Sequence, residues 1–255
     1  MADDSLADRP LERRHRGATR RPGRIVRDVL IVLVAAIIVS FLVKTFVVRS
    51  FYIPSASMQN TLQIDDHVIV NELVPSIFPV ERGDIVVFRE PGGWLDRPAS
   101  ETPTNPIAEA VGWVLSLVGL ASSDSEGFLI KRVFGLPGDH VTCCTPFGGI
   151  SINGALLQEP YVWVPEGEEL VRFPFDVVVP LGMFLPLGDN RNHSGDFRYN
   201  RDKPGGGFVP VANVVGRAFL VTWPLWHWTW LDNYPDVFRE IPGRESKALL
   251  PAGTR

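Results

Sequence analysis

The sequence contains very little cysteine: two residues in 255, and they are neighbours, Cys143 and Cys144. Adjacent cysteines can close only a strained ring, so a framework of disulfides is excluded as the basis of the fold. A Cys-x-x-Cys pair for zinc or redox chemistry is also missing. We expect two buried or half-buried thiols, with a vicinal or intermolecular disulfide as the alternative.

The sequence also lacks a metal-binding motif. Its five histidines are scattered, and no His-Glu-x-x-His segment occurs. We therefore expect no metal and no cofactor. Hydrophobic residues make up 45% of the chain and charged residues 21%, which excludes wholesale disorder.

Charge is unevenly placed in the sequence, because eight arginines lie together before the apolar run. No aromatic residues interleave with them and no nucleic-acid-reading domain follows, so we expect no nucleic-acid partner. We interpret residues 1–27 as a disordered basic tail that sets membrane topology. The arginines are Arg9, Arg13, Arg14, Arg16, Arg20, Arg21, Arg24 and Arg27.

Long apolar runs are limited to one, residues 29–48. Twenty residues make about 30 Å of helix, enough to span a bilayer, so we predict a transmembrane helix over 28–48. A cleavable signal peptide is the competing interpretation, but bulky residues follow Lys44 where Ala-x-Ala would be needed. The arginine excess then places the N-terminus in the cytoplasm and the rest of the chain outside it.

Helical periodicity is weak beyond that run, whereas the 23 glycines and 22 prolines of the chain favour turns. Short runs with β-branched residues, bounded by turn residues, predict strands. For residues 49–242 we therefore expect a mainly β domain, an antiparallel β-barrel or sandwich. The predicted strands are 66–71, 82–88, 128–134, 140–143, 149–153 with a turn at Gly154, 175–179, 183–187 and 214–221.

Three segments depart from the strand pattern. Residues 91–127 read as an insertion between two strands, with an apolar helical part at 107–120 that is too short to cross a bilayer. Residues 223–230 hold four of the seven tryptophans and fit a bilayer interface or an aromatic core cluster equally well. Residues 243–255 read as a disordered tail.

The first stretch that could carry chemistry is Phe51-Tyr52-Ile53-Pro54-Ser55-Ala56-Ser57-Met58, just after the apolar run. Pro54 fixes its own φ and biases Ile53 towards an extended backbone, so the chain enters the serines stiffly. By itself this is a polar turn.

A second stretch is centred on Lys131, which strand alternation places on the face of Leu129 and Val133. If that face is buried, desolvation lowers the lysine pKa and makes the amine a competent general base for a serine hydroxyl. The competing interpretation is an exposed lysine at a sheet edge.

Taken together and in order, four boxes resemble bacterial type I signal peptidase, the membrane-bound serine protease with a Ser/Lys dyad. Its eukaryotic branch has histidine in place of the lysine, so Lys131 indicates the bacterial branch. The resemblance covers about residues 29–220. The boxes are Pro54-Ser55-Ala56-Ser57-Met58, Arg82-Gly83-Asp84-Ile85-Val86-Val87-Phe88, Lys131-Arg132-Val133-Phe134-Gly135-Leu136-Pro137-Gly138-Asp139, and Gly188-Asp189-Asn190-Arg191 through Ser194, Asp196 and Arg198.

The resemblance implies a role for each matching residue. Ser57 is the nucleophile and Lys131 the general base, while the Ser55 hydroxyl joins the Ser57 N–H as the oxyanion hole. Ser194 orients the lysine amine. The remaining matches are supporting residues, the ion pair of Asp196 and Arg198 with Asp189 near it.

Two positions depart from the family pattern. Ala56 stands where glycine is usual, which is tolerable only if its φ is negative. Asn192-His193 replaces a more common Asp-Asn, and we interpret His193 as a loop residue because the pattern provides no acid partner for a His-based triad.

The resemblance implies a single-spanning membrane protease, expected to be a monomer, with its catalytic domain on the extracytoplasmic side. It would remove signal peptides from exported preproteins after small residues of the Ala-x-Ala type. Its partners would be those signal peptides, the lipid bilayer and the translocation machinery.

Two rival functions remain. A penicillin-recognising acyltransferase needs Ser-x-x-Lys, but Asn60 stands three residues after Ser57. A catalytically inactive β module that binds peptides or envelope partners is the other rival, and the presence of both Ser57 and Lys131 argues against it.

Overall fold

The computed structural model of the protein describes residues 22–95, 127–144, 149–170 and 173–242. The chain forms two compact units, Met1–Leu42 and Val43–Arg255, and each is described by itself. The predicted tail 243–255, most of the predicted tail 1–27 and the helical part of the predicted insertion lie outside the described residues.

The described part of the first unit is helical. Helix α1 spans Pro22–Phe46, so it begins before the predicted residue 28 and ends before Val48, which opens the first strand. Apolar side chains along it, such as Val29, Ile37 and Phe41, are exposed. Within the described residues, no helix combines the length and apolarity required to cross a membrane, and the predicted transmembrane helix is not confirmed.

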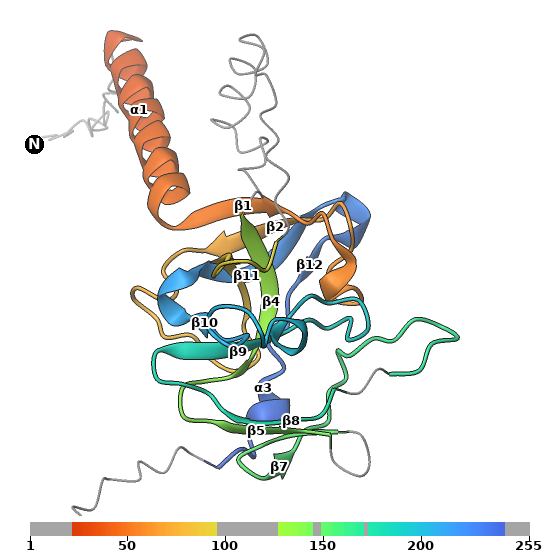
Figure 1. Ribbon diagram of the computed structural model, residues 1–255. Helices are drawn as coiled ribbons and strands as arrows, with labels where there is room; N and C mark the ends of the chain where they lie inside the picture. The colour runs from red at the N-terminus through yellow and green to blue at the C-terminus, as the bar shows by residue number, and fades with distance from the viewer. Residues whose placement is uncertain (1–21, 96–126, 145–148, 171–172, 243–255) are drawn as a thin grey trace, which may run out of the picture. The chain divides into compact units, whose positions relative to one another are not determined.

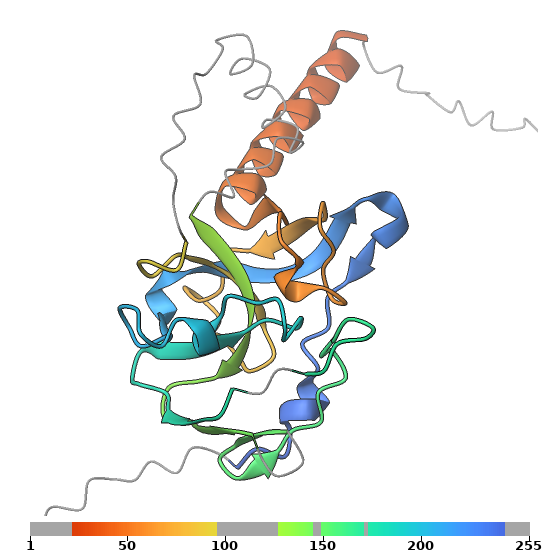
Figure 2. The same ribbon diagram turned by 45° about the vertical axis from the view of Figure 1, so that its right-hand side comes forward.

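The second unit is built on a large antiparallel sheet (Figures 1 and 2). Its strands run in the order β1-β2-β11-β3-β4-β9-β10, and β12 pairs with β11. The strands are β1 (Val48–Tyr52), β2 (His67–Asn71), β3 (Ile85–Arg89), β4 (Phe128–Gly135), β9 (Met183–Leu187), β10 (Val209–Pro210), β11 (Val214–Trp223) and β12 (Thr229–Trp230).

A smaller antiparallel sheet lies beyond the C-terminal end of β4 (Figures 1 and 2). Asn153 and Gly154 both have positive φ, at 52° and 86°, and join two of its strands at the predicted turn. The strand order is β7-β6-β5-β8, with β5 (His140–Cys143), β6 (Ile150–Ile152), β7 (Ala155–Leu156) and β8 (Phe175–Val178).

Short helices complete the second unit. Within the described residues, four are single 3-10 turns and one is α-helical, and the first of them is the next element after β1. They are η1 (Ala56–Met58), η2 (Phe197–Tyr199), η3 (Val211–Asn213), η4 (Leu225–His227) and α3 (Pro235–Phe238).

These elements confirm the prediction of a mainly antiparallel β domain, and each predicted strand coincides with an observed one. The sequence pattern missed β1, β7, β10 and β12. Three of these are two-residue strands, too short for alternation to be visible. The fourth strand, β1, begins at Val48, which is also the last residue of the apolar run, so the sequence shows no boundary between the two.

Strand β3 explains why the centre of the large sheet is buried on both faces. Ile85 and Val87 belong to one apolar cluster with Phe51 and Met58, whereas Val86 and Phe88 belong to another on the opposite face. β4 pairs with β3 along its first five residues. From Ile130 onward, β4 is therefore buried on both faces.

The interval between β3 and β4 contains the predicted insertion. β3 ends at Arg89 and β4 begins at Phe128, and the two strands pair antiparallel as neighbours. Residues 96–126 lie outside the described part of the chain.

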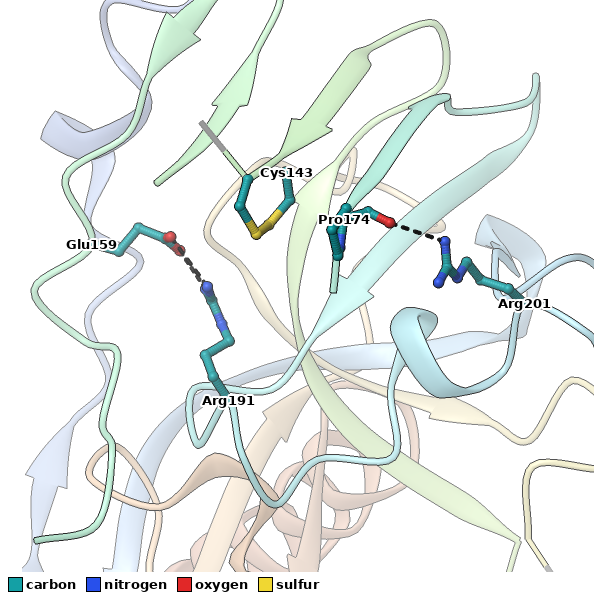
Figure 3. Close-up of a disulfide and its surroundings, with 6 residues drawn as sticks. Cys143, Glu159, Pro174, Arg191 and Arg201 are labelled. Carbon is teal, nitrogen blue, oxygen red and sulfur yellow. Dashed lines mark hydrogen bonds and ion pairs between the residues drawn. A yellow bond between two sulfur atoms is a disulfide. The ribbon is translucent and has the colours of Figure 1, made fainter. Parts of the chain in front are cut away.

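The two cysteines differ from the expectation of free thiols. Cys143 and Cys144 form a vicinal disulfide, with an S–S distance of 2.03 Å (Figure 3). Their peptide bond is cis, and their Cα atoms are only 3.0 Å apart, which lets neighbouring sulfur atoms meet.

The tryptophan-rich segment is at the surface. Trp223, Trp226, Trp228 and Trp230 are 52%, 86%, 57% and 66% exposed. The interpretation as an aromatic core cluster is therefore wrong. A contact nevertheless attaches the segment to the sheet, because His227 Nδ1 lies 2.9 Å from the buried carboxylate of Asp66, next to β2. We call these four residues the tryptophan patch.

Candidate active site

The local sequence brings Ser57 to the boundary between core and surface. Ser55 is extended, with φ −127° and ψ 155°, and the chain then turns sharply through η1. Met58 is fully buried and fixes the turn in the core, whereas Ser55 is exposed. Ala56 does not have a positive φ, so its methyl group is tolerated where glycine is usual.

Lys131 reaches Ser57 from β4. It pairs with Val86 of β3, and its residue is only 3% exposed. Its Nζ donates to Ser57 Oγ at 2.6 Å and to the Ile130 carbonyl at 3.0 Å. Residues 74 positions apart therefore form a hydroxyl-amine pair with hydrogen-bond geometry.

Burial changes the acid-base behaviour of this amine. Desolvation lowers the pKa of Lys131 from 10.5 to about 8, and Arg198 adds to the lowering, while Asp196 and Asp189 partly oppose it. The Lys131 amine is thus neutral in a substantial fraction of molecules near pH 8, where a free lysine is almost wholly charged.

The other two predicted serines lie near this pair in different ways. Ser55 Oγ is 3.4 Å from Ser57 Oγ. Ser194 is buried, but its Oγ makes no hydrogen bond with any described residue. The predicted bond from Ser194 to the lysine amine is therefore not formed in this structure, where the Ile130 carbonyl accepts from Lys131.

Gly188 makes the close approach of these segments feasible. A Cβ atom at this position would lie 2.1 Å from Ser194 Oγ and 2.5 Å from the Ser57 carbonyl oxygen. A glycine is required here for space, because the loop after β9 packs directly on the backbone of the turn that carries Ser57.

Asp196 and Arg198 form the predicted ion pair. Arg198 Nε and Nη2 donate to the carboxylate at 2.9 and 2.8 Å, and the Gly188 N–H donates at 3.0 Å. Burial alone would raise the Asp196 pKa, but these donors hold it below its usual value. Ser194 adds to that lowering although it lies outside hydrogen-bond geometry.

Asp189, which the resemblance places near that pair, is bound by a different arginine. It accepts two hydrogen bonds from Arg132, at 2.9 and 2.7 Å, with both side chains 1% exposed. Thr61 Oγ1 also donates to it at 2.6 Å. The reason is the register of β4, which directs Arg132 to the loop after β9.

Sequence reasoning missed three residues at this site: Arg132, Thr61 and Asn190. Each lies within or next to a quoted motif, but only long-range contacts distinguish them from ordinary neighbours. The available signal was Arg132 itself, a second charge beside Lys131 in a strand whose other residues carry none, since a buried charge needs a partner.

Two further residues complete the surroundings of the loop after β9. Arg191 extends toward Glu159 and forms an ion pair with it (Figure 3). The His193 side chain is about half exposed, and its Nε2 lies 3.7 Å from the carboxylate of Glu168. Among the described residues, no group of His, Cys, Asp and Glu side chains is arranged to hold a metal ion.

Comparison with known proteins gives consistent matches. The family model described as "Signal peptidase, peptidase S26" matches residues 26–223. "Signal peptidase I" of Mycobacterium tuberculosis is 34% identical over 80% of this chain and 74% of its own length. "Probable signal peptidase I-2" of Synechocystis is 35% identical over 76% and 71%. "Signal peptidase I" of Leptolyngbya laminosa is 35% identical over 68% of each chain. The resemblance seen in the sequence is confirmed, and the chain belongs to the peptidase S26 family of signal peptidases.

Proposed function

We propose that this protein is a membrane-anchored serine endopeptidase that removes N-terminal signal peptides from exported preproteins after small residues. Ser57 is the nucleophile and Lys131 the general base. The observation that carries the proposal is the 2.6 Å contact between Ser57 Oγ and a buried amine whose pKa is lowered to about 8.

Acylation begins when the Lys131 amine is neutral, so that the Ser57 hydroxyl donates to Nζ. Ser57 Oγ bonds to the scissile carbonyl carbon, the π electron pair moves to the carbonyl oxygen, and the hydroxyl proton moves to Nζ. The oxyanion then collapses, the C–N bond breaks, and Lys131 returns the proton to the leaving amine. The signal peptide remains as an ester on Ser57.

Water completes the cycle by the same exchange. It loses a proton to Lys131 as it attacks the ester, and Ser57 recovers that proton as it leaves. The Ile130 carbonyl, which accepts from Nζ at 3.0 Å, keeps the amine directed at Ser57 during both steps.

Charge on the oxyanion needs donors that are already in place. We propose the Ser57 N–H and the Ser55 hydroxyl for this role. Ser57 is the second residue of η1, and the first N–H groups of a helical turn have no acceptor within it. The 3.4 Å separation of Ser55 Oγ from Ser57 Oγ puts the second donor within reach of the same carbonyl.

Substrate binding is proposed along the edge of the large sheet. β1 is at the end of the strand order and leads directly into Ser55 and Ser57. An extended peptide gains main-chain hydrogen bonds at such an edge, with shallow apolar pockets for alanine-sized side chains at alternate positions.

We further propose that the protein acts at the bilayer, with its N-terminus cytoplasmic and the β unit outside. Support comes from the apolar sequence of residues 29–48, the exposed apolar side chains of α1 and the arginines before it. The exposed tryptophan patch suits a bilayer interface. Signal peptides, lipid and the translocation machinery are the proposed partners of a monomer.

The test is cleavage of a preprotein with an Ala-x-Ala site by the detergent-solubilised full chain. Wild type should cut after the second alanine, and Ser57→Ala and Lys131→Ala should each be at least about a thousandfold slower. Ser76→Ala and Lys203→Ala, at exposed positions, serve as matched controls and should keep wild-type rates. Cleavage by Ser57→Ala would exclude the proposed nucleophile, and peptide binding without cleavage by wild type would favour the inactive module.

A further inference from the structure

Asn190 contacts the nucleophile turn from the loop after β9. Its residue is fully buried. Its side-chain Nδ2 donates to the Ala56 carbonyl at 3.1 Å, and its backbone N–H donates to the Ser57 carbonyl at 3.2 Å. One residue therefore holds the carbonyls on both sides of the nucleophile's α-carbon.

The side-chain bond matters because of the peptide unit it reaches. The Ala56 carbonyl and the Ser57 N–H are the two ends of one planar peptide, which is not among the cis bonds of the described residues. In a trans peptide these groups point in opposite directions. Fixing the carbonyl on Asn190 therefore fixes the direction of the N–H on the other side.

The orientation of the Asn190 amide is set by a second contact. Its Oδ1 accepts from the His193 N–H at 3.3 Å, which leaves Nδ2 to face Ala56. A carboxylate in the same place could still accept from the His193 N–H but could not donate to the Ala56 carbonyl.

The loop that carries Asn190 is itself anchored. The preceding Asp189 is held by Arg132 and Thr61 through its side chain, and its carbonyl accepts from the Trp163 N–H at 3.1 Å. Trp163 also forms an isolated bridge with Asn190. Asn190 thus contacts the turn that carries Ser57 from a loop whose own position is fixed by these contacts.

We propose that Asn190 is a positioning residue for the oxyanion hole. Its amide holds the Ala56–Ser57 peptide so that the Ser57 N–H points at the developing oxyanion, and it polarises that peptide so that the N–H is a stronger donor. The inference rests on the proposed serine protease function. Asn190 does not touch the substrate, and it acts through the peptide unit.

The size of the effect follows from what remains when the amide is lost. The Ala56 carbonyl also accepts from the Gln59 N–H at 3.0 Å, so the turn persists. Complete loss of an oxyanion donor lowers kcat by about 100- to 1000-fold, and a misdirected donor should lower it less, by about tenfold.

The test uses the full chain in detergent with an Ala-x-Ala peptide substrate. Asn190→Asp keeps the volume and the acceptor for His193, and Asn190→Ala removes the side chain. Both should lower kcat by about tenfold with KM within about twofold, because the bond acts in the transition state. Asn192→Ala, an amide in the same loop that bonds to Glu168 and Glu169, is the matched control and should keep the wild-type kcat.

Two readouts separate positioning from general disruption. A peptide aldehyde, which forms an oxyanion on Ser57, should bind the variants about tenfold more weakly, in step with kcat. The pH midpoint of kcat/KM should be unchanged, because the Lys131 amine is not a partner of Asn190. A shifted midpoint in either variant, or aldehyde affinity equal to wild type, would overturn the inference.

The two hypotheses fail differently. Wild type that does not cleave the peptide contradicts the protease function. Wild type that cleaves, with Asn190→Asp as fast as Asn192→Ala, contradicts only the role of Asn190. A variant that unfolds in urea at the same concentration as wild type but loses kcat supports that role.

Discussion

Arg132 and Asp189 form a buried ion pair with two hydrogen bonds, at 2.9 and 2.7 Å. Arg132 directly follows the proposed base on β4, and Asp189 also accepts from Thr61, four residues after the proposed nucleophile. The pair therefore joins the strand of Lys131 to the turn of Ser57. A charge pair with its hydrogen bonds made, rather than a flexible loop, thus links the backbones that carry the proposed base and nucleophile.

Removing one partner should be strongly destabilising. Asp189→Ala leaves the Arg132 charge buried and without its carboxylate, and we expect the free energy of unfolding to fall by about 3–5 kcal/mol. Urea denaturation monitored by tryptophan fluorescence measures this. Arg49→Ala, which breaks the partly exposed pair with Glu72, is the control and should cost about 1 kcal/mol or less. Equal losses in the two variants would contradict a stabilising role for the buried pair.

The pH dependence of cleavage should follow the Lys131 amine. In the proposed mechanism the neutral amine is the active form, and its pKa is about 8. kcat/KM should therefore rise about tenfold per pH unit below that value and level off above it. Initial rates from pH 6 to 10 measure the profile. A rate that still climbs above pH 10 would mean that the amine titrates like a solvated lysine.

Lys131, the proposed base, should reduce the stability of the fold. Its folded pKa of about 8 lies below the unfolded value of 10.5, so below pH 8 the fold contains a buried charge, whereas above pH 10.5 the amine is neutral in both states. Lys131→Met should raise the free energy of unfolding by on the order of 3 kcal/mol at pH 7, and by less as pH rises through that window. Urea denaturation at pH 7 and pH 10 tests the sign, with exposed Lys203→Met as the control. A gain that grows with pH would contradict the linkage.

Gly188 should be intolerant of a methyl group. An added Cβ would lie 2.5 Å from the Ser57 carbonyl oxygen. Because this is a backbone atom, the turn that carries Ser57 must move. We expect Gly188→Ala to lower kcat/KM by about a hundredfold, the effect of roughly 1 Å of misplacement. Gly195→Ala in the same loop meets nothing within 4 Å and should stay within about twofold of wild type. Similar losses in both variants would point to the flexibility of the loop instead of the contact with Ser57.

The tryptophan patch should be in contact with lipid. In vesicles of phosphatidylcholine that contain brominated acyl chains, the fluorescence of the reconstituted full chain should be quenched, because rings at the interface lie near the bromines. Trp226→Ser and Trp228→Ser should reduce the quenched fraction. Exposed Leu181→Ser, outside the patch, should leave it unchanged. Quenching equal to wild type in both tryptophan variants would contradict the membrane contact.

The sequence by itself determined the class of the domain and the family. Strands such as β5 and β9 were visible because alternating or β-branched runs between turn residues report local burial. Ser57 and Lys131 were found because their motifs are local in the chain. The same local pattern could not separate an aromatic core from an exposed patch for Trp226, since tryptophan suits both places.

Only the tertiary structure decided which side chains contact one another. Three hydrogen-bonded contacts join segments that are far apart in the chain: Lys131 with Ser57, Arg132 with Asp189, and Asn190 with Ala56. Periodicity fixes the face on which a side chain lies, but strand register and loop packing fix what it meets there. That is why the proposed nucleophile and base could be named from the sequence, whereas the residues that contact them from distant segments could not.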